Sequence, residues 1–185
     1  MNLRNDATGY GAVARLLHWL AALCILAAWG LGITLDDVPK RFEPRALWMH
    51  ETIGLALLAI VLVRLGWRLG GNPPPPALPG PMARWSQPLA HGLHWLLYAL
   101  MIAVPVIGIV LTFARGQSLP LFGLAEIASP WPRDRALART IKGIHELSAN
   151  LTILLATIHA AAALAHHYLL RDDTLRRMLP RRNKG

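Results

Sequence analysis

Long apolar stretches alternate with shorter polar connections along most of this chain. Four stretches reach the ~20 apolar residues that a helix needs to cross the hydrocarbon core of a membrane. They run from Leu16 to Leu35, from Ala46 to Leu65, from Leu93 to Ala114 and from Ile144 to about Leu170. With flanking turns included, we expect helices at about 13–35, 46–69, 88–114 and 141–170. The pattern predicts an all-α integral membrane protein, a four-helix transmembrane bundle that forms a single domain over residues 1–185.

Two connections differ from the others. Gly70 to Asn72 and the run Pro73 to Pro76 should end the second helix and form an extended spacer, because consecutive prolines cannot donate helical hydrogen bonds. The connection from Arg115 to Thr140 is the longest and contains Phe122 and Trp131. It is too apolar for a simple linker, so we expect it to lie in the membrane interface and cap the outer end of the bundle.

Composition supports this assignment. Of the 185 residues, 54% are hydrophobic and only 16% are charged, which is too apolar for an ordinary soluble domain. Cys24 is the single cysteine and cannot form an internal disulfide. The segment before it is too short for the core of a signal peptide, so the first span is expected to be retained.

The basic residues favour one orientation in the membrane. With an even number of spans, both termini share one compartment with the connection between the second and third spans. Three of the ten acids lie on that side, together with eleven of the nineteen cations: Arg4, Arg15, Arg64, Arg68, Arg84, Arg171, Arg176, Arg177, Arg181, Arg182 and Lys184. Because Lys and Arg concentrate on the cytoplasmic side, we expect both termini to be cytoplasmic. The net charge of +9 is then explained by cations that set this orientation and contact anionic lipid headgroups. Nucleic-acid binding is not expected.

His145 and His159 share one apolar stretch, and His18 and His50 lie in two others, where an imidazole is costly unless it is paired or coordinates something. His145 and His159 are fourteen residues apart, so both leave one helix face about 21 Å apart along the axis. By depth, His50 matches His145 near the outer surface and His18 matches His159 near the cytoplasmic surface. Each pair joins two different helices, which favours two haems, each ligated by two imidazoles.

Other assignments remain open from the residues alone. A buried histidine is more often a hydrogen-bonded structural group than a ligand. At the cytoplasmic end, His91, His94, His166 and His167 cluster, and any of them could replace His159 as the inner ligand. Otherwise they could relay protons, bind quinone or bond lipid headgroups; His94, His166 and His167 are the candidate quinone residues. A zinc or iron site is disfavoured because carboxylates and thiolates are scarce, and a transporter with histidine sites would contain no haem.

Haem propionates need cationic partners. Arg15, Arg64 and Arg68 lie at the inner site, whereas Arg45, Arg115 and Lys142 lie at the outer one. We expect Arg15, Arg64 and Arg45 to contact the haems. The alternative is that these cationic side chains extend to lipid headgroups, and this alternative has most support for Arg68.

Several short segments resemble the bacterial cytochrome b561 family. They are Arg15-Leu-Leu-His18-Trp, Met49-His50, Leu89-Ala-His-Gly-Leu-His94, Lys142-Gly-Ile-His-Glu-Leu-Ser-Ala-Asn150 and His159-Ala-Ala-Ala-Ala-Leu-Ala-His-His167-Tyr. The resemblance covers nearly the whole chain. It implies a four-helix domain of the bacterial inner membrane that binds two haem b groups through His18, His50, His145 and His159.

The resemblance also implies an activity. A member of the family is a superoxide oxidase that passes electrons from superoxide through the haems to ubiquinone, so both are expected partners besides the lipid bilayer. Cations at the outer haem suit an anionic donor, and Lys142 and Arg115 are expected to guide superoxide. The alternative is a haem b electron-transfer subunit that anchors a respiratory dehydrogenase or hydrogenase and docks this redox partner on the connection 115–140.

Overall fold

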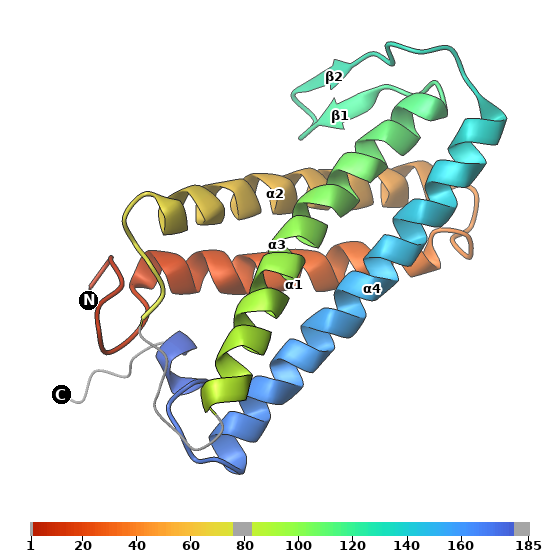
Figure 1. Ribbon diagram of the computed structural model, residues 1–185. Helices are drawn as coiled ribbons and strands as arrows, with labels where there is room; N and C mark the ends of the chain where they lie inside the picture. The colour runs from red at the N-terminus through yellow and green to blue at the C-terminus, as the bar shows by residue number, and fades with distance from the viewer. Residues whose placement is uncertain (1, 76–82, 180–185) are drawn as a thin grey trace.

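The computed structural model describes residues 2–75 and 83–179 as a helical membrane bundle (Figure 1). The long helices are α1 (Ala12–Thr34), α2 (Glu43–Leu69), α3 (Ala83–Ala114) and α4 (Arg135–Tyr168), and a short 3-10 helix, η1 (Arg176–Met178), follows α4. The four-helix prediction is therefore confirmed. Residue 76 of the predicted proline spacer, the rest of the connection to residue 82 and the basic tail from residue 180 lie outside the described residues.

All four helices are long and apolar enough to cross a membrane. Their large apolar side chains are mostly turned outward: Leu16 is 60% exposed, Leu23 63% and Leu147 72%. Such a surface would be unfavourable in water, but lipid chains solvate it as well as another apolar side chain does. The chain is therefore a multi-pass membrane protein.

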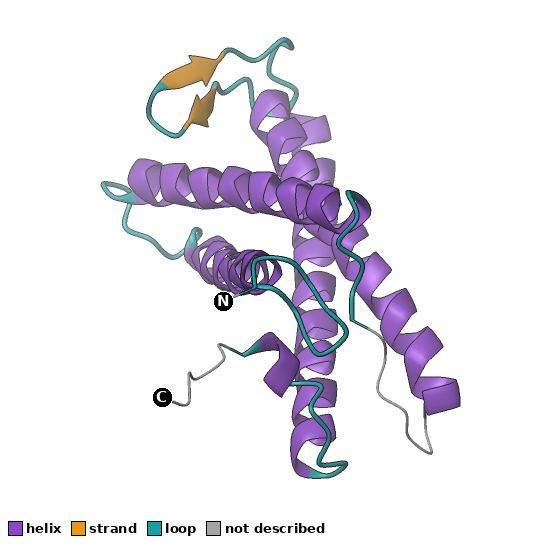
Figure 2. Ribbon diagram, turned by 90° about the vertical axis from the view of Figure 1, so that its left-hand side faces the viewer, coloured by secondary structure: helices purple, strands orange, loops and turns teal. Residues whose placement is uncertain are grey.

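Helices α1 and α2 pack along each other, as do α3 and α4, and the α1–α2 pair crosses the α3–α4 pair at a large angle (Figure 1). We call the end with the α1–α2 and α3–α4 connections the loop end, and the opposite end the terminal end. At the terminal end, the chain after α4 returns to the start of α1, where Arg15 Nη1 donates to the Leu179 carbonyl (3.1 Å) and Trp19 Nε1 donates to the Met178 carbonyl (3.0 Å). Figure 2 shows this return beside the N-terminal segment.

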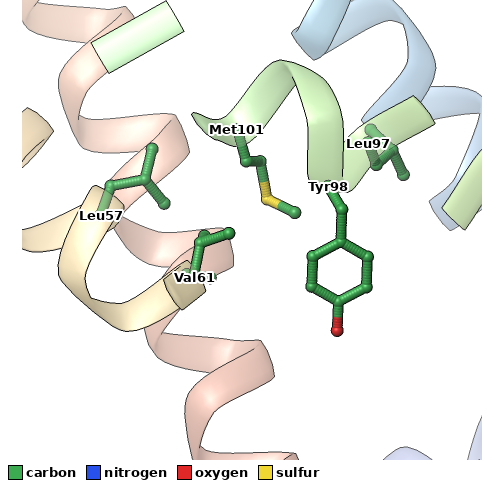
Figure 3. Packing of buried hydrophobic residues seen from close by; sticks show 6 residues of the cluster. Leu57, Val61, Leu97, Tyr98 and Met101 are labelled. Atoms are coloured by element: carbon green, nitrogen blue, oxygen red, sulfur yellow. The ribbon is translucent and has the colours of Figure 1, made fainter. Parts of the chain in front are cut away.

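A small apolar core joins the two helix pairs at mid-depth. Its buried members are Ala21, Leu57, Val61, Leu97, Tyr98 and Met101, and all of them except Ala21 are labelled in Figure 3. Val61 is fully buried. Leu57 and Met101 also line a cavity nearer the loop end, whereas the Tyr98 ring is covered by arginines nearer the terminal end. The core therefore separates two interior regions, one towards each end of the bundle.

Helix α4 begins at Arg135, six residues before the expected start at 141. The Asp134 carboxylate caps it by accepting hydrogen bonds from the amides of Ala136 (2.9 Å) and Leu137 (3.0 Å). These first turns are polar, so they lie beyond the apolar stretch from which the expected boundary was taken. Helix α3 also begins before the expected residue 88, at Ala83.

The connection between α3 and α4 contains a small β-hairpin that the all-helical prediction did not include. Strand β1 (Leu119–Leu121) pairs antiparallel with β2 (Ala125–Ile127), and the turn uses Phe122 and Gly123 with positive φ. Leu119 is 4% exposed and lines the cavity near the loop end, whereas Leu124 at the tip is 90% exposed. The hairpin thus covers part of the loop end and presents an apolar tip.

Candidate functional site: two facing histidine pairs

His50 of α2 and His145 of α4 face each other near the loop end. Their ring centroids are 6.0 Å apart, and the ring planes are inclined by 76°. In each ring, Nδ1 lies next to a backbone carbonyl: Ala28 O of α1 is 2.9 Å from His50, and Val104 O of α3 is 3.1 Å from His145. A carbonyl can only accept, so both Nδ1 atoms carry the proton and both Nε2 atoms keep a lone pair. That tautomer is the one a metal-binding imidazole uses.

Two glycines allow these ring positions. A Cβ atom on Gly32 of α1 would lie 3.1 Å from His50 Cε1, and one on Gly108 of α3 would lie 3.2 Å from His145 Cε1. Both separations are tighter than ordinary van der Waals contact. Each glycine follows by four residues the carbonyl that its imidazole contacts, so the missing side chain lets the ring reach that carbonyl.

A cavity of about 90 Å³ adjoins the two loop-end imidazoles. Its lining comes from all four helices and includes Ile25, Leu57, Met101 and Ala149. Sites for organic cofactors are lined mainly by apolar side chains with a few polar groups, and this lining has that character. On its polar side, Thr112 Oγ1 donates to Glu51 Oε1 at 2.8 Å.

His18 of α1 and His159 of α4 face each other towards the terminal end, with centroids 6.2 Å apart and planes inclined by 69°. The ring of His94 of α3 packs edge-on against the His159 ring, with centroids 5.2 Å apart. His18 Nδ1 is buried, and no hydrogen-bond partner for it lies within residues 2–75 and 83–179. The structure therefore brings His18 and His159 together, as their matched depth predicted.

Both facing pairs have the separation that a shared metal ion needs. With metal–nitrogen bonds of about 2.0 Å and each ring centre about 1.1 Å beyond its nitrogen, two imidazoles on opposite sides of one ion have centroids about 6.2 Å apart. The observed values are 6.0 and 6.2 Å. His94 and His159, at 5.2 Å, are closer together than imidazoles on opposite sides of one ion would be. The residues present therefore fit two bis-imidazole haems, and the loop-end pair also has the cavity and the fixed tautomers.

The other terminal-end histidines have different surroundings. His91 Nε2 accepts from Trp95 Nε1 at 3.2 Å. His166 Nδ1 contacts Asp172 Oδ2 at 2.5 Å, and His167 Nδ1 is buried without a partner in the described part of the chain. The geometry thus favours His159 over these residues as the inner ligand. Sequence reasoning missed Asp172, because a carboxylate just beyond a span looks like an ordinary surface group.

The terminal-end arginines lie close to the inner pair. Arg64 lies over the Tyr98 ring with Cζ 5.5 Å from its centroid, and Arg68 lies over the Trp95 ring at 4.9 Å. Arg15 is 6% exposed and bonds the Leu179 carbonyl described above. Burial raises the pKa of the Tyr10 hydroxyl beside these cations, so this group stays protonated.

The two residues predicted to guide superoxide differ in their surroundings. Lys142 Nζ pairs with Asp36 Oδ2 (2.9 Å) and Glu146 Oε1 (3.5 Å), so two carboxylates balance its charge. Arg115 is half-buried and makes no side-chain hydrogen bond or ion pair among the described residues. Its charge is close enough to act on both His50 and His145. Arg45, a predicted haem contact, is exposed.

Comparisons with known proteins show which family the chain belongs to. The family model described as prokaryotic cytochrome b561 matches residues 9–181. The chain is 37% identical to "Probable superoxide oxidase CybB" of Yersinia pestis over 90% of this chain and 93% of that protein. It is 40% identical to "Cytochrome b561 homolog 1" of Escherichia coli K12, over 90% and 94% of the two chains. It is 30% identical to "Cytochrome b561 homolog 2" of the same strain, over 97% and 95%.

Proposed function

This chain belongs to the prokaryotic cytochrome b561 family, and on that basis we propose that it is a di-haem cytochrome of the bacterial inner membrane that oxidises superoxide and reduces ubiquinone. The observation that carries the proposal is the pair of facing histidine sites, with centroids 6.0 and 6.2 Å apart. His50 and His145 would hold one haem b, and His18 and His159 the other. When bound, the haems would supply reversible one-electron transfer. The loop end is assigned to the periplasm and the terminal end to the cytoplasm.

The loop end suits a small anionic donor. Oxidation of superoxide to dioxygen releases one electron and no proton, so no catalytic base is needed there. A cation near the site raises the local concentration of an anion. Arg115 forms no ion pair among the described residues, although Glu51 is within electrostatic range of it, whereas two carboxylates pair directly with Lys142 and reduce its attraction for a distant anion. We therefore assign superoxide guidance mainly to Arg115, with Lys142 secondary.

The terminal end suits the quinone. Reduction of one ubiquinone consumes two electrons, which two superoxide anions supply, and two protons. His94 lies against His159, so it can bond a quinone carbonyl beside the inner site. His166 and His167 lie further towards the aqueous end of α4 and are the other quinone candidates. Arg15 and Arg64 are the candidate partners of the inner propionates, and Arg45 of the outer ones.

Spectroscopy and rapid kinetics on the purified chain test this proposal. We expect two b-type haems per chain in the reduced-minus-oxidised spectrum, and fast haem reduction when superoxide is mixed in. Replacing His50 or His145 by Ala should remove the same haem, and replacing His18 or His159 the other. A spectrum without haem bands would overturn the proposal.

Arg115→Gln tests the guidance. It should slow haem reduction by superoxide several-fold without changing haem content, and the wild-type rate should fall as salt screens exposed charge. Arg139→Gln, an exposed cation at the same end, is the matched control and should leave the rate unchanged. A rate independent of both salt and Arg115 would contradict guidance. If a dehydrogenase or hydrogenase co-purifies in stoichiometric amount and superoxide reduces neither haem, the anchoring-subunit function would replace the proposal.

A further inference from the structure

Quinone reduction at the terminal end needs a proton donor. Arg15, Arg64 and Arg68 cannot serve, because a guanidinium does not release its proton in a protein. Imidazole can, since it changes protonation near neutral pH. The terminal-end histidines, together with the groups that orient them, are therefore the candidate proton donors.

His166 has a carboxylate partner held in a fixed position. Asp172 Oδ2 lies 2.5 Å from His166 Nδ1, and Asp172 Oδ1 accepts from the Thr174 amide at 2.8 Å. The Asp172 amide in turn donates to the His166 carbonyl at 3.1 Å. The turn that brings the two side chains together includes Arg171 in the left-handed region, with φ 54°. The carboxylate therefore contacts the ring in a geometry that the backbone imposes at some conformational cost.

This contact leaves the other ring nitrogen available. Because Asp172 occupies Nδ1, proton exchange falls to Nε2, for which the described residues provide no hydrogen-bond partner. Both side chains are part-exposed, His166 at 29% and Asp172 at 25%, so water can reach them. The aspartate pKa is set by opposing effects: burial raises it, but hydrogen bonds from His166 and Thr174 outweigh burial and lower it. Asp172 therefore stays ionised at neutral pH and can stabilise a protonated imidazole.

The position of the pair along α4 connects it to the inner site. His166 follows His159 by seven residues, which is close to two full turns, so both residues share one helix face about 10.5 Å apart. His166 lies on the aqueous side of His159. Negative charge at the C-terminal end of a helix also favours protonated histidine there. Other titratable or charged groups nearby are His167, Tyr168, Arg171, Asp173 and Arg176 around the turn, His94 on α3 against His159, and Arg15 of α1 at Leu179.

From this geometry we infer that Asp172 and His166 form a proton-transfer dyad that supplies the quinone from the cytoplasmic side. The inference rests on the proposed function and assigns its proton step. The N–H bond at His166 Nε2 breaks as an O–H bond forms on the quinone oxygen, and the ring then takes a new proton from water. Over one turnover, two superoxide anions, one quinone and two protons give two dioxygen molecules and one quinol. Asp172 keeps its charge throughout and orients the ring.

Separating the two half-reactions in the purified holoprotein tests the dyad. Asp172→Asn should leave haem reduction by superoxide unchanged and slow haem reoxidation by a short-chain ubiquinone at least about tenfold, since a positioned proton donor contributes roughly 10²–10⁴-fold. Loss of the carboxylate should also change the pH profile of reoxidation, because the charge beside the His166 ring is removed. Asp172→Glu should restore part of the rate. Asp173→Asn is the matched control: Asp173 pairs only weakly with Arg176, at 3.4 Å on the surface, and its variant should behave as wild type.

The outcomes are distinguishable. If Asp172→Asn reoxidises at the wild-type rate at every pH, the dyad is wrong while the proposed function stands. If Asp173→Asn slows as much, the segment acts through structure and not through proton transfer. Should Asp172→Asn fail to fold, wild-type protein still decides: reoxidation that is insensitive to pH and to D2O overturns the dyad. Wild type that quinone cannot reoxidise overturns the proposed function, and the dyad with it.

Discussion

Gly32 of α1 lies beside the His50 ring of α2, and Gly108 of α3 lies in the same way beside the His145 ring of α4. In both cases the imidazole Nδ1 donates to the carbonyl of the residue that lies four positions before the glycine on the same helix. A side chain on the glycine would press against the imidazole ring. The usual i to i+4 bond already uses one lone pair of that carbonyl, and the imidazole takes the other. Ring orientation at the loop end thus depends on an absent side chain.

Gly108→Ala should disturb the loop-end haem. The added Cβ would lie 3.2 Å from His145 Cε1, so the ring must move by a few tenths of an ångström. We expect altered spectra and partial loss of that haem, with the other haem unchanged, and the same for Gly32→Ala. Redox titration and electron paramagnetic resonance would measure this.

The controls lie on the same helices. A Cβ atom on Gly30 of α1 or on Gly92 of α3 would meet no neighbouring side chain of the described residues within 4 Å, so Ala at either site should leave both haem signatures intact. Equal effects in all four variants would show that helix flexibility matters rather than ring position.

At the scale of single elements, the Asp134 cap fixes where α4 begins. Asp134→Ala removes the acceptor of two amide hydrogen bonds, and loss of such a cap typically costs about 1 kcal/mol. For a chain of this size that corresponds to a fall of roughly 2–4 °C in the unfolding temperature. Thermal unfolding in detergent measures it. Glu126→Ala, which removes an exposed acid of β2, should leave the melting temperature unchanged; a similar loss there would argue against the cap.

The helices were predictable because each span is a long run of apolar residues. The facing of the histidine pairs was predictable because the residue numbers give each histidine's helix face and its depth in the membrane. The polar first turns of α4 carry no such signal, so its start was placed too late. The β-hairpin was missed because its strands are only three residues long and contain Pro120. The pairing of Lys142 with Asp36 joins residues 106 positions apart, and no local pattern indicates it.

At the scale of the whole molecule, each histidine pair joins one helix pair to the other. His18 and His50 belong to α1 and α2, whereas both partners, His145 and His159, belong to α4. Direct packing between the two helix pairs is mainly the small core around Val61. If the haems bind as proposed, their ligation would add two cross-links between parts that otherwise share little buried surface.

Removing both cross-links should destabilise the bundle. A ligand present at 1,000 times its Kd stabilises a protein by about 4 kcal/mol, so loss of two haems should lower the unfolding temperature markedly. His145→Ala combined with His159→Ala is the test, followed by thermal unfolding and haem analysis. His91→Ala, which removes a histidine outside both pairs, should keep both haems and the wild-type melting temperature. A double variant as heat-resistant as wild type would show that helix packing alone suffices.

The crossing of the two helix pairs has a consequence for biosynthesis. Each pair can enter the membrane as a unit during translation, before any cofactor arrives, because its own helices already pack along each other. If the haems bind as proposed, final closure would wait for these prosthetic groups, and the amount of mature protein should then follow the iron and porphyrin supply of the cell. A chain that stays open would expose its inward-facing histidines to lipid, and we expect membrane proteases to degrade it. Starvation for iron would then reduce the abundance of this protein at the level of degradation, without any change in transcription.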